Sequence, residues 1–167
     1  MTTCYIGLGG NISNELGTPD QHIRQAAAAF VASSAFEQVQ LSSLYRSKAY
    51  GVTDQPDFYN AVLSANTSLL PLDLLDFCQS LEQAAGRVRL RHWGERSLDV
   101  DVLLYGDEQI CHDRLIVPHR ELMLRNFVLV PLLELDADLC VQGVRLDSCP
   151  LAHDMTGLEK LAAAGIE

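Results

Sequence analysis

Apolar and polar positions change their period several times along the chain, which predicts a mixture of helices and strands rather than a helical bundle or a solenoid. Residues 4–8 form an apolar run that ends at Gly9-Gly10-Asn11, so we expect a first strand followed by a tight turn. Residues 38–45 alternate between mainly apolar and mainly polar side chains, which is typical of a strand with one buried face. Residues 58–67 and 98–105 are further apolar segments, and we expect a strand in each.

Two segments between these strands have helical patterns. Thr18-Pro19-Asp20 combines a capping residue, a proline suited to the first turn and an early acid, and an alanine-rich stretch follows it. Pro71 opens a second helix, in which an apolar stripe ends at the capping residue Gly86 and consists of Leu74, Cys78, Leu81 and Ala85. The order strand, helix, strand, strand, helix, strand predicts an α+β fold with a ferredoxin-like βαββαβ core, in which both helices cover one face of the sheet. We expect a mixed C-terminal extension from about Gly106.

The composition limits the class of protein. With 167 residues, of which 48% are hydrophobic and 20% charged, we expect a single domain over residues 1–167. A formal net charge of -10 disfavours binding to nucleic acid or to anionic lipid. No apolar stretch approaches the roughly 20 residues that span a bilayer, and no basic segment precedes the first apolar run. We therefore expect a cytoplasmic protein with no nucleic-acid and no membrane partner, and we separately expect a monomer.

The cysteines are scattered along the chain and form no C-x-x-C pair. An odd number at irregular spacing predicts neither a disulfide framework nor a zinc site. We expect buried free thiols at Cys4, Cys78, Cys111, Cys140 and Cys149.

Cationic residues concentrate in one segment of this acidic chain, at Arg87, Arg89, Arg91 and Arg96. Several guanidinium groups on one loop can surround a polyphosphate, although such a loop can also be a solvated one that pairs with surplus acids. The strand that follows carries Asp99 and Asp101 at i and i+2, so both carboxylates face the same way, about 7 Å apart. Oxygen ligands at this spacing suit Mg2+, which takes its other ligands from water and from substrate phosphates. The two clusters together indicate phosphoryl transfer.

Two other segments carry candidate binding residues. Residues 114–120 and 125–127 add cationic and hydrogen-bonding groups, among them His119, although an extended edge segment with a surface histidine would have the same pattern. Residues 54–60 combine turn residues with two aromatic rings and an amide, which can hold and read a flat heterocycle or can be core packing at the start of a strand. The Gly7-x-Gly9-Gly10 pattern lacks the third glycine of a dinucleotide-binding loop, which favours a turn.

In this order, the motifs resemble those of the 6-hydroxymethyl-7,8-dihydropterin pyrophosphokinase family over almost the whole chain. The matching motifs are Gly9-Gly10-Asn11, Ser43-Leu44-Tyr45-Arg46, residues 54–60, Glu82-x-x-x-Gly86-Arg87, residues 93–101 and Val117-Pro118-His119. The resemblance implies transfer of pyrophosphate from ATP to 6-hydroxymethyl-7,8-dihydropterin, giving AMP and the pterin diphosphate in folate biosynthesis. It also implies ATP as co-substrate and two Mg2+ ions.

The resemblance further implies roles for individual residues. The metal ligands would be Asp99 and Asp101, and the catalytic group would be Arg87, Arg91, Arg96, Asp99 and Asp101. ATP would contact Leu75, Gln79, Arg96, Val102, Arg114, Ile116, His119 and Arg125. The pterin would contact Ser47, Tyr50, Phe58, Asn60, Trp93 and Phe127. Glu82 stands where the family has an acidic residue on the second helix.

Several alternatives stay open at the level of sequence. Residues 89–93 are one residue shorter than the matching segment of the family, so either Arg91 or His92 takes the place of an arginine found there. We favour Arg91, because a loop absorbs a one-residue change more easily than a polyphosphate site loses a permanent charge. A degenerate relative that binds ATP or a pterin with little turnover is the alternative function. A ferredoxin-like nucleic-acid-binding module fits least well with the net charge.

Overall fold

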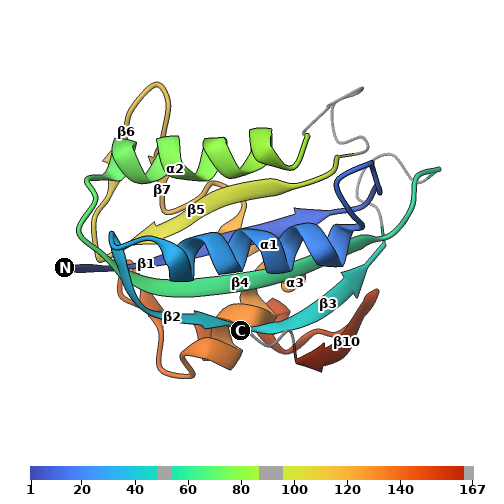
Figure 1. Cartoon of the computed structure of the whole chain (residues 1–167). Helices are drawn as coiled ribbons and strands as arrows, with labels where there is room; N and C mark the ends of the chain where they lie inside the picture. Colours follow the sequence, from blue (N-terminus) through green and yellow to red (C-terminus); the bar gives the residue numbers. More distant parts are fainter. Residues whose placement is uncertain (49–53, 87–95, 164–167) are drawn as a thin grey trace.

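The fold is built on an antiparallel six-stranded sheet (Figure 1). The structure, a computed structural model, describes residues 1–48, 54–86 and 96–163. The sheet comprises β1 (Thr2–Gly10), β2 (Phe36–Leu41), β3 (Ser43–Ser47), β4 (Phe58–Thr67), β5 (Asp99–Tyr105) and β10 (Leu158–Ala163). Its strands follow the order β10-β3-β4-β1-β5, and β2 pairs with the C-terminal half of β4. The predicted mixture of α and β structure is confirmed.

Helices cover both faces of this sheet (Figure 1). On one face α1 (Pro19–Ala32) and α2 (Pro71–Ala84) bury their apolar stripes, through residues such as Phe30 and Leu74, in a core with Ile6 of β1. On the other face α3 (Asn126–Leu135) buries Leu129 and Leu132 against a second cluster of apolar residues. Each core residue removed from water contributes roughly 1.5–3 kcal/mol before conformational entropy is subtracted.

The helix boundaries follow the local signals in the sequence. At the start of α1, the side-chain oxygen of Gln21 accepts a hydrogen bond of 2.9 Å from the backbone N–H of Thr18, which satisfies a donor at the helix end. At the end of α2, Gly86 has φ +70°, a left-handed conformation that glycine adopts without strain. The apolar stripe of α2 is buried at Leu74, Cys78 and Ala85 as predicted.

Two strand predictions need correction. The single strand expected over 38–45 is two strands, β2 and β3, separated at Ser42. Ser42 is fully buried, and its hydroxyl accepts the backbone N–H of Val62 at 2.9 Å, so a side chain replaces a backbone group in the pairing with β4. The turn expected at Gly9-Gly10 is also wrong, because β1 continues through Gly10.

Other groups closely approach two of the glycines of β1, Gly9 and Gly10. A Cβ at Gly10 would lie 2.3 Å from the backbone oxygen of Ser97, and one at Gly9 would lie 2.8 Å from the side-chain oxygen of Asn60. A Cβ at Gly7 would meet the Leu103 side chain at an ordinary 3.4 Å. Steric approach, and not the chain reversal that a glycine pair suggests, is the physical reason for the motif.

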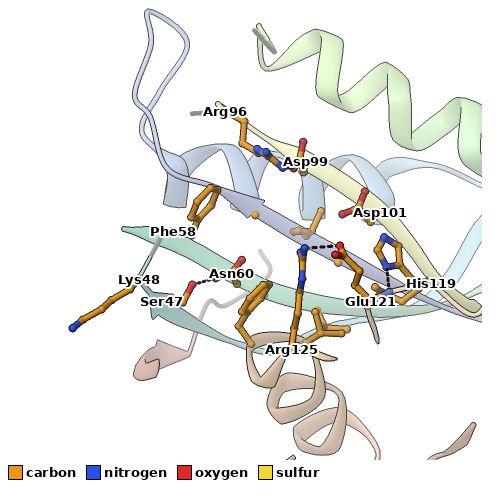
Figure 2. Close-up of a pocket in the computed structure, with 18 residues that line it drawn as sticks. Ser47, Lys48, Phe58, Asn60, Arg96, Asp99, Asp101, His119, Glu121 and Arg125 are labelled. Atoms are coloured by element: carbon orange, nitrogen blue, oxygen red, sulfur yellow. Dashed lines mark hydrogen bonds and ion pairs between the residues drawn. The ribbon is translucent and has the colours of Figure 1, made fainter. Parts of the chain in front are cut away.

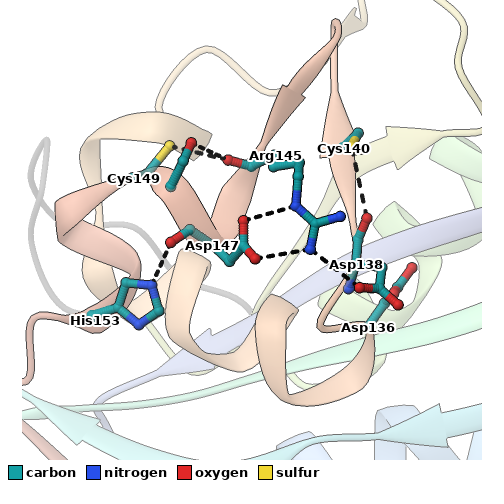
Figure 3. A network of polar contacts seen from close by, with 8 residues as sticks. Asp136, Asp138, Cys140, Arg145, Asp147, Cys149 and His153 are labelled. Carbon is teal, nitrogen blue, oxygen red and sulfur yellow. Dashed lines mark hydrogen bonds and ion pairs between the residues drawn. The ribbon is translucent and has the colours of Figure 1, made fainter.

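The C-terminal extension returns to the sheet. It contains β6 (Ile110–Cys111), β7 (Ile116–Val117), η1 (Leu122–Leu124), α3, β8 (Cys140–Val141), β9 (Val144–Arg145), η2 (Leu146–Ser148), η3 (Pro150–His153) and finally β10, which pairs with β3. Arg145 organises the segment after α3, because its guanidinium donates to Asp147 at 2.8 Å and to Asp138 at 3.2 Å (Figure 3). A nitrogen of the His153 ring lies 2.6 Å from the backbone oxygen of Asp147 and closes this unit.

The cysteines are free thiols, as expected, but only two of them are buried. Cys4 and Cys78 lie in the core, and burial raises the pKa of the Cys4 thiol to about 12, which makes it unreactive. Cys111 and Cys140 are exposed and Cys149 is partly exposed, which corrects the expectation that all of them are buried. Among the described residues, no helix has both the length and the apolar character needed to cross a membrane.

Candidate active site

Paired strands β1 and β5 form the floor of a pocket on the α3 face of the sheet (Figure 2). Asp99 and Asp101 of β5 lie opposite Gly9 and Gly7 of β1. The two carboxylates therefore lie beside backbone that carries no side chain, and Gly7 and Gly9 themselves line the pocket. The i, i+2 spacing puts both carboxylates on this face, as the sequence predicted.

The two aspartates have different electrostatic surroundings. Asp99 forms an ion pair with the Arg96 guanidinium, and both side chains are 13% exposed. Asp101 is accessible from the pocket but is crowded by protein atoms. Desolvation and the charge of Asp99 raise its pKa, and electrostatic interactions with His119, Arg96 and Arg125 oppose this rise. The charge of Asp99 thus disfavours ionisation of Asp101.

A segment that follows β7 supplies one wall of the pocket (Figure 2). The His119 backbone N–H donates to the backbone oxygen of Leu103 at 3.0 Å, which fixes this segment along the outer edge of β5. Nδ1 of His119 accepts the backbone N–H of Glu121 at 3.1 Å, so in the neutral ring the proton is on Nε2. Glu121 also pairs with Arg125, whose guanidinium carbon lies 5.3 Å from the ring centroid of Phe127.

The opposite end of the pocket combines an aromatic ring with a buried amide. Phe58 begins β4, and the guanidinium carbon of Arg96 lies 5.7 Å from the centroid of its ring. Asn60 is 7% exposed and donates its side-chain N–H to the hydroxyl of Ser47 at 2.8 Å. This bond orients the amide of Asn60, which lines the pocket. Phe127 lines the same pocket.

A second groove adjoins the pocket at Asp101 and His119. Leu75, Val102, Arg114 and Ile116 line it, as the predicted nucleotide-contacting residues would require. Gln79 lies next to it, because its side-chain oxygen accepts a hydrogen bond of 3.2 Å from Arg114. Arg114 also pairs with Asp76 on α2. The two recesses share their aspartate and histidine, so a ligand lying in both would place its middle beside the acidic pair.

The structure brings together most of the site residues that the sequence singled out. Four of them, Tyr50, Arg87, Arg91 and Trp93, lie outside the described residues, as do Arg89 and His92. Sequence reasoning missed Glu121 and Lys48, which line the pocket. Glu121 stands two positions after the V-P-H motif, and an acid among so many cations was a signal of pairing. It also missed Asn11, whose role depends on contacts across 44 and 85 residues of sequence.

An acidic pair on the edge strand β5, an arginine beside it and an adjoining apolar groove together define an enzyme of the phosphotransferase class. Comparison with known proteins makes this assignment specific. Residues 5–137 match the family described as 7,8-dihydro-6-hydroxymethylpterin-pyrophosphokinase (HPPK), and the chain belongs to that family.

Individual relatives support the assignment. The chain is 49% identical over 146 residues to the 2-amino-4-hydroxy-6-hydroxymethyldihydropteridine pyrophosphokinase of Haemophilus influenzae, covering 87% of this chain and 89% of that one. It is 39% identical over 161 residues to the Methylorubrum extorquens protein of the same name, covering 96% and 99% of the two chains. A crystal structure titled HPPK-DHPS in complex with substrates has a TM-score of 0.68 at 10% identity and covers 96% of this chain. This chain spans 48% of that longer one, and the likeness shows the fold.

Proposed function

We propose that this pocket transfers the pyrophosphoryl group of ATP to the hydroxymethyl oxygen of 6-hydroxymethyl-7,8-dihydropterin. Family membership makes the protein a pyrophosphokinase that acts in folate biosynthesis. In the proposed reaction the hydroxymethyl oxygen attacks the β-phosphorus of ATP. The bond from that phosphorus to the oxygen bridging to the α-phosphate breaks, AMP leaves, and the hydroxyl proton is released. The observation that carries the proposal is the single pocket in which the acidic pair, Arg96 and the Phe58–Asn60 end lie together.

Arg96 is proposed as the charge-stabilising catalytic residue. Its side chain is 13% exposed, and it lies between the carboxylate of Asp99 and the ring of Phe58. A guanidinium in this position is aimed at the place where negative charge shifts from the attacking oxygen to the leaving phosphate. The Nε2 proton of His119 and the Arg125 guanidinium are proposed to bind phosphate oxygens from the other wall.

Asp99 and Asp101 fit a divalent cation. Their donor set is two carboxylates, which are the hard oxygen ligands that Mg2+ prefers, and the raised pKa of Asp101 reflects a charge that a cation would offset. Two Mg2+ ions, held by these residues and by ATP phosphates, would neutralise phosphate charge and align the transferred group. Catalytic roles for Arg87 and Arg91 are part of the same proposal.

The two recesses are proposed to divide the substrates between them. The adenosine end of ATP would lie in the groove lined by Leu75, Val102, Arg114 and Ile116, with Gln79 at its edge. The pterin would lie between Phe58 and Phe127, with Asn60 reading its edge, and Ser47, Tyr50 and Trp93 are proposed to complete that site. This division places the triphosphate over the acidic pair.

We further propose that the core formed by β1 to β5 with α1 and α2 is a ferredoxin-like unit within a single domain over 1–167. The sheet order, with β1 between β4 and β5 and both helices on one face, supports this. A cytoplasmic monomer without nucleic-acid partners is the assembly we propose for it.

One assay tests the function directly. AMP should form from ATP only when both Mg2+ and 6-hydroxymethyl-7,8-dihydropterin are present, and the variant Arg96→Ala should lower kcat by about 100-fold or more. Arg24→Ala is the matched control, because Arg24 is an exposed arginine on α1 that forms an ion pair with the partly exposed Asp20, and the rate of this variant should stay at the wild-type value. AMP formation without the pterin would contradict the proposal. An Arg96→Ala effect confined to KM would contradict the catalytic role of Arg96.

A further inference from the structure

Asn11 holds two segments of the site together although it does not line the pocket. It follows the last residue of β1 and is 4% exposed. Its side-chain nitrogen donates to the side-chain oxygen of Gln55 at 2.8 Å and to the backbone oxygen of Pro56 at 3.0 Å. Its side-chain oxygen accepts the backbone N–H of Arg96 at 2.9 Å. One buried amide thus uses both of its ends on different parts of the chain.

The two segments that Asn11 joins serve the two substrates. Gln55 and Pro56 lie immediately before Phe58, the aromatic residue at the pterin end of the pocket. Arg96 lies at the phosphate end, where it pairs with Asp99. Asn11 therefore connects the segment leading to the pterin site with the backbone of the residue that faces the transferred group.

The backbone around Asn11 restricts this connection further. The N–H of Asn11 donates to the backbone oxygen of Arg96 at 3.0 Å, so the two residues bond through both the side chain and the backbone of Asn11. A Cβ at Gly10 would collide with the backbone oxygen of Ser97 at 2.3 Å, so the strand end lies against the 96–97 segment. The distance between Arg96 and β1 is thereby determined by backbone contact, and the side-chain nitrogen of Asn11 extends the same connection to residues 55–56.

We propose that Asn11 is a positioning residue that sets the Arg96 guanidinium relative to the pterin end of the pocket. Attack by the hydroxymethyl oxygen needs that oxygen and the β-phosphorus in line at about 3–3.5 Å, and a displacement of about 1 Å costs on the order of 100-fold in rate. Asn11 acts on this alignment through Arg96 and through Gln55 and Pro56. The inference rests on the proposed function, because it assigns the two ends of the pocket to the two substrates.

Two variants distinguish the two arms of this connection. The pterin arm is the pair of hydrogen bonds from Asn11 to Gln55 and Pro56, and the other arm is the hydrogen bond between Asn11 and Arg96. Asn11→Ala removes both arms and should lower kcat by about 10-fold or more while raising KM for the pterin by a similar factor. Gln55→Ala removes an acceptor on the pterin arm only, so KM for the pterin should rise several-fold while kcat stays within about threefold of wild type. Both variants should bind a Mg2+ complex of a non-hydrolysable ATP analogue within about threefold of wild type, because the adenosine groove is built from α2, β5 and the 114–116 segment.

Thr67→Val is the matched control for loss of stability. Thr67 is 1% exposed at the far end of β4, and its hydroxyl donates to the backbone oxygen of Ala35 at 3.1 Å and accepts the backbone N–H of Leu69 at 3.1 Å. Its loss should lower Tm without changing kcat or either KM. If Asn11→Ala behaves like Thr67→Val, with lower Tm and unchanged kinetics, the positioning role is overturned.

A measurement that needs no turnover tests the Asn11–Arg96 contact independently of the proposed function. Asn11→Asp retains a side-chain oxygen that can accept the Arg96 amide, whereas Asn11→Ala does not. Amide hydrogen exchange at Arg96, measured by NMR, should therefore be about 10-fold or more faster in Asn11→Ala and closer to wild type in Asn11→Asp. Equal exchange in all three proteins would overturn the connection itself. Absence of AMP formation by the wild-type protein would instead refute the proposed function and leave the exchange result to decide on the contact.

Discussion

At the scale of single residues, Asp99 and Asp101 are two positions apart but differ in their electrostatic surroundings. Asp99 is compensated by Arg96, whereas the pKa of Asp101 is raised by desolvation and by the charge of Asp99. A carboxyl whose pKa is higher in the folded protein than in the unfolded chain destabilises the fold above the unfolded value, and this cost disappears at lower pH. The charge of Asp101 that the proposed function needs therefore lowers the stability of the fold.

We predict that Asp101→Asn raises the free energy of unfolding at pH 7 in metal-free buffer while abolishing AMP formation. The reason is that the amide has no charge to desolvate and does not repel Asp99. Urea denaturation of the variant and the wild type measures the difference, which should shrink as the pH falls below the ordinary aspartate range. Asp99→Asn is the control and should not be stabilised, because it loses the ion pair with Arg96. A lower free energy of unfolding for Asp101→Asn than for wild type at pH 7 would show that the charge of Asp101 does not destabilise the fold.

A second prediction at this scale concerns the glycines of β1. Gly10→Ala should destabilise the protein by about 1–3 kcal/mol, because its Cβ would meet the backbone oxygen of Ser97 at 2.3 Å and backbone cannot rotate away. Gly7→Ala meets only the Leu103 side chain at 3.4 Å, so its unfolding free energy should stay within about 1 kcal/mol of wild type. Chemical denaturation measures both, and a larger loss in Gly7→Ala than in Gly10→Ala would contradict the steric explanation.

At the scale of elements, α2 holds in place β5, the strand that carries the acidic pair. Glu82 of α2 is 9% exposed, and its carboxylate accepts the backbone N–H of Val100 at 2.9 Å, between the two aspartates of β5. β5 pairs with β1 on one side only, so this N–H on its outer edge needs a partner from elsewhere. The contact fixes the strand segment from which both carboxylates project.

Replacement of Glu82 tests this contact. Glu82→Leu leaves the Val100 amide without that acceptor, which should cost about 1–3 kcal/mol of stability and lower kcat. Glu82→Gln keeps an oxygen acceptor at the same position, so it should retain more of the stability and more of the kcat than Glu82→Leu. Denaturation and AMP formation are the measurements, and equal effects of the two substitutions would assign the role to the charge of Glu82 instead of its hydrogen bond.

The attachment of α3 to β3 has a pH dependence. Glu134 of α3 accepts the backbone N–H of Ser43 at 2.8 Å and the hydroxyl of Tyr45 at 2.5 Å. Burial would raise the pKa of Glu134, but these hydrogen bonds outweigh it and hold the pKa below its usual range. The stabilisation is therefore complete above the ordinary glutamate pKa and is lost as the pH falls through the lowered value.

We accordingly predict that Glu134→Gln lowers the free energy of unfolding by about 1–2 kcal/mol at pH 7, and that its difference from wild type narrows below about pH 4.5. Urea denaturation at several pH values measures this. Glu159→Gln breaks the exposed pair with Arg46 and is the control, with an expected loss of about 0–1 kcal/mol. A difference that stays constant from pH 7 to pH 3.5 would refute the charged hydrogen bonds.

At the scale of the whole molecule, the acidic net charge contrasts with a site that collects cations. The chain carries a formal charge of -10, yet Arg96 and Arg125 line one pocket around the acidic pair. A polyanionic ligand can bind in this pocket because the compensation is local. Binding to the folded state alone must also stabilise the whole fold.

A Mg2+ complex of a non-hydrolysable ATP analogue, present at about 100 times its Kd, should stabilise the fold by about 2.7 kcal/mol. For a chain of this size that corresponds to a rise in Tm of about 5–10 °C. Differential scanning fluorimetry measures it, and the shift should be much smaller with EDTA or in Asp101→Asn at the same ligand concentration. An equal shift with and without the metal would contradict a role of the acidic pair in holding it.

Elements with strong local patterns could be predicted from the sequence. Capping chemistry and periods of 3.6 and 2 residues, which depend on near neighbours, predict the helix starts at Pro19 and Pro71 and the strand at 58–67. The period of 2 also predicts that Asp99 and Asp101 share one side of their strand. The order of the motifs also indicated the enzyme family that the comparisons confirmed. Local physical chemistry was sufficient for the helices and strands, whereas the family followed from the resemblance of the motifs.

Long-range contacts determined the rest. The break at Ser42, the pairing of β10 with β3 and the cover that α3 gives to the second face each depend on a partner distant in sequence, about which local patterns carry no information. The same is true of Asn11, whose amide meets Gln55 and Arg96 only because β1 ends between them. Gly10 shows the difference most simply: its sequence context predicts a turn, but the missing Cβ is required by a backbone oxygen 2.3 Å from where that atom would be.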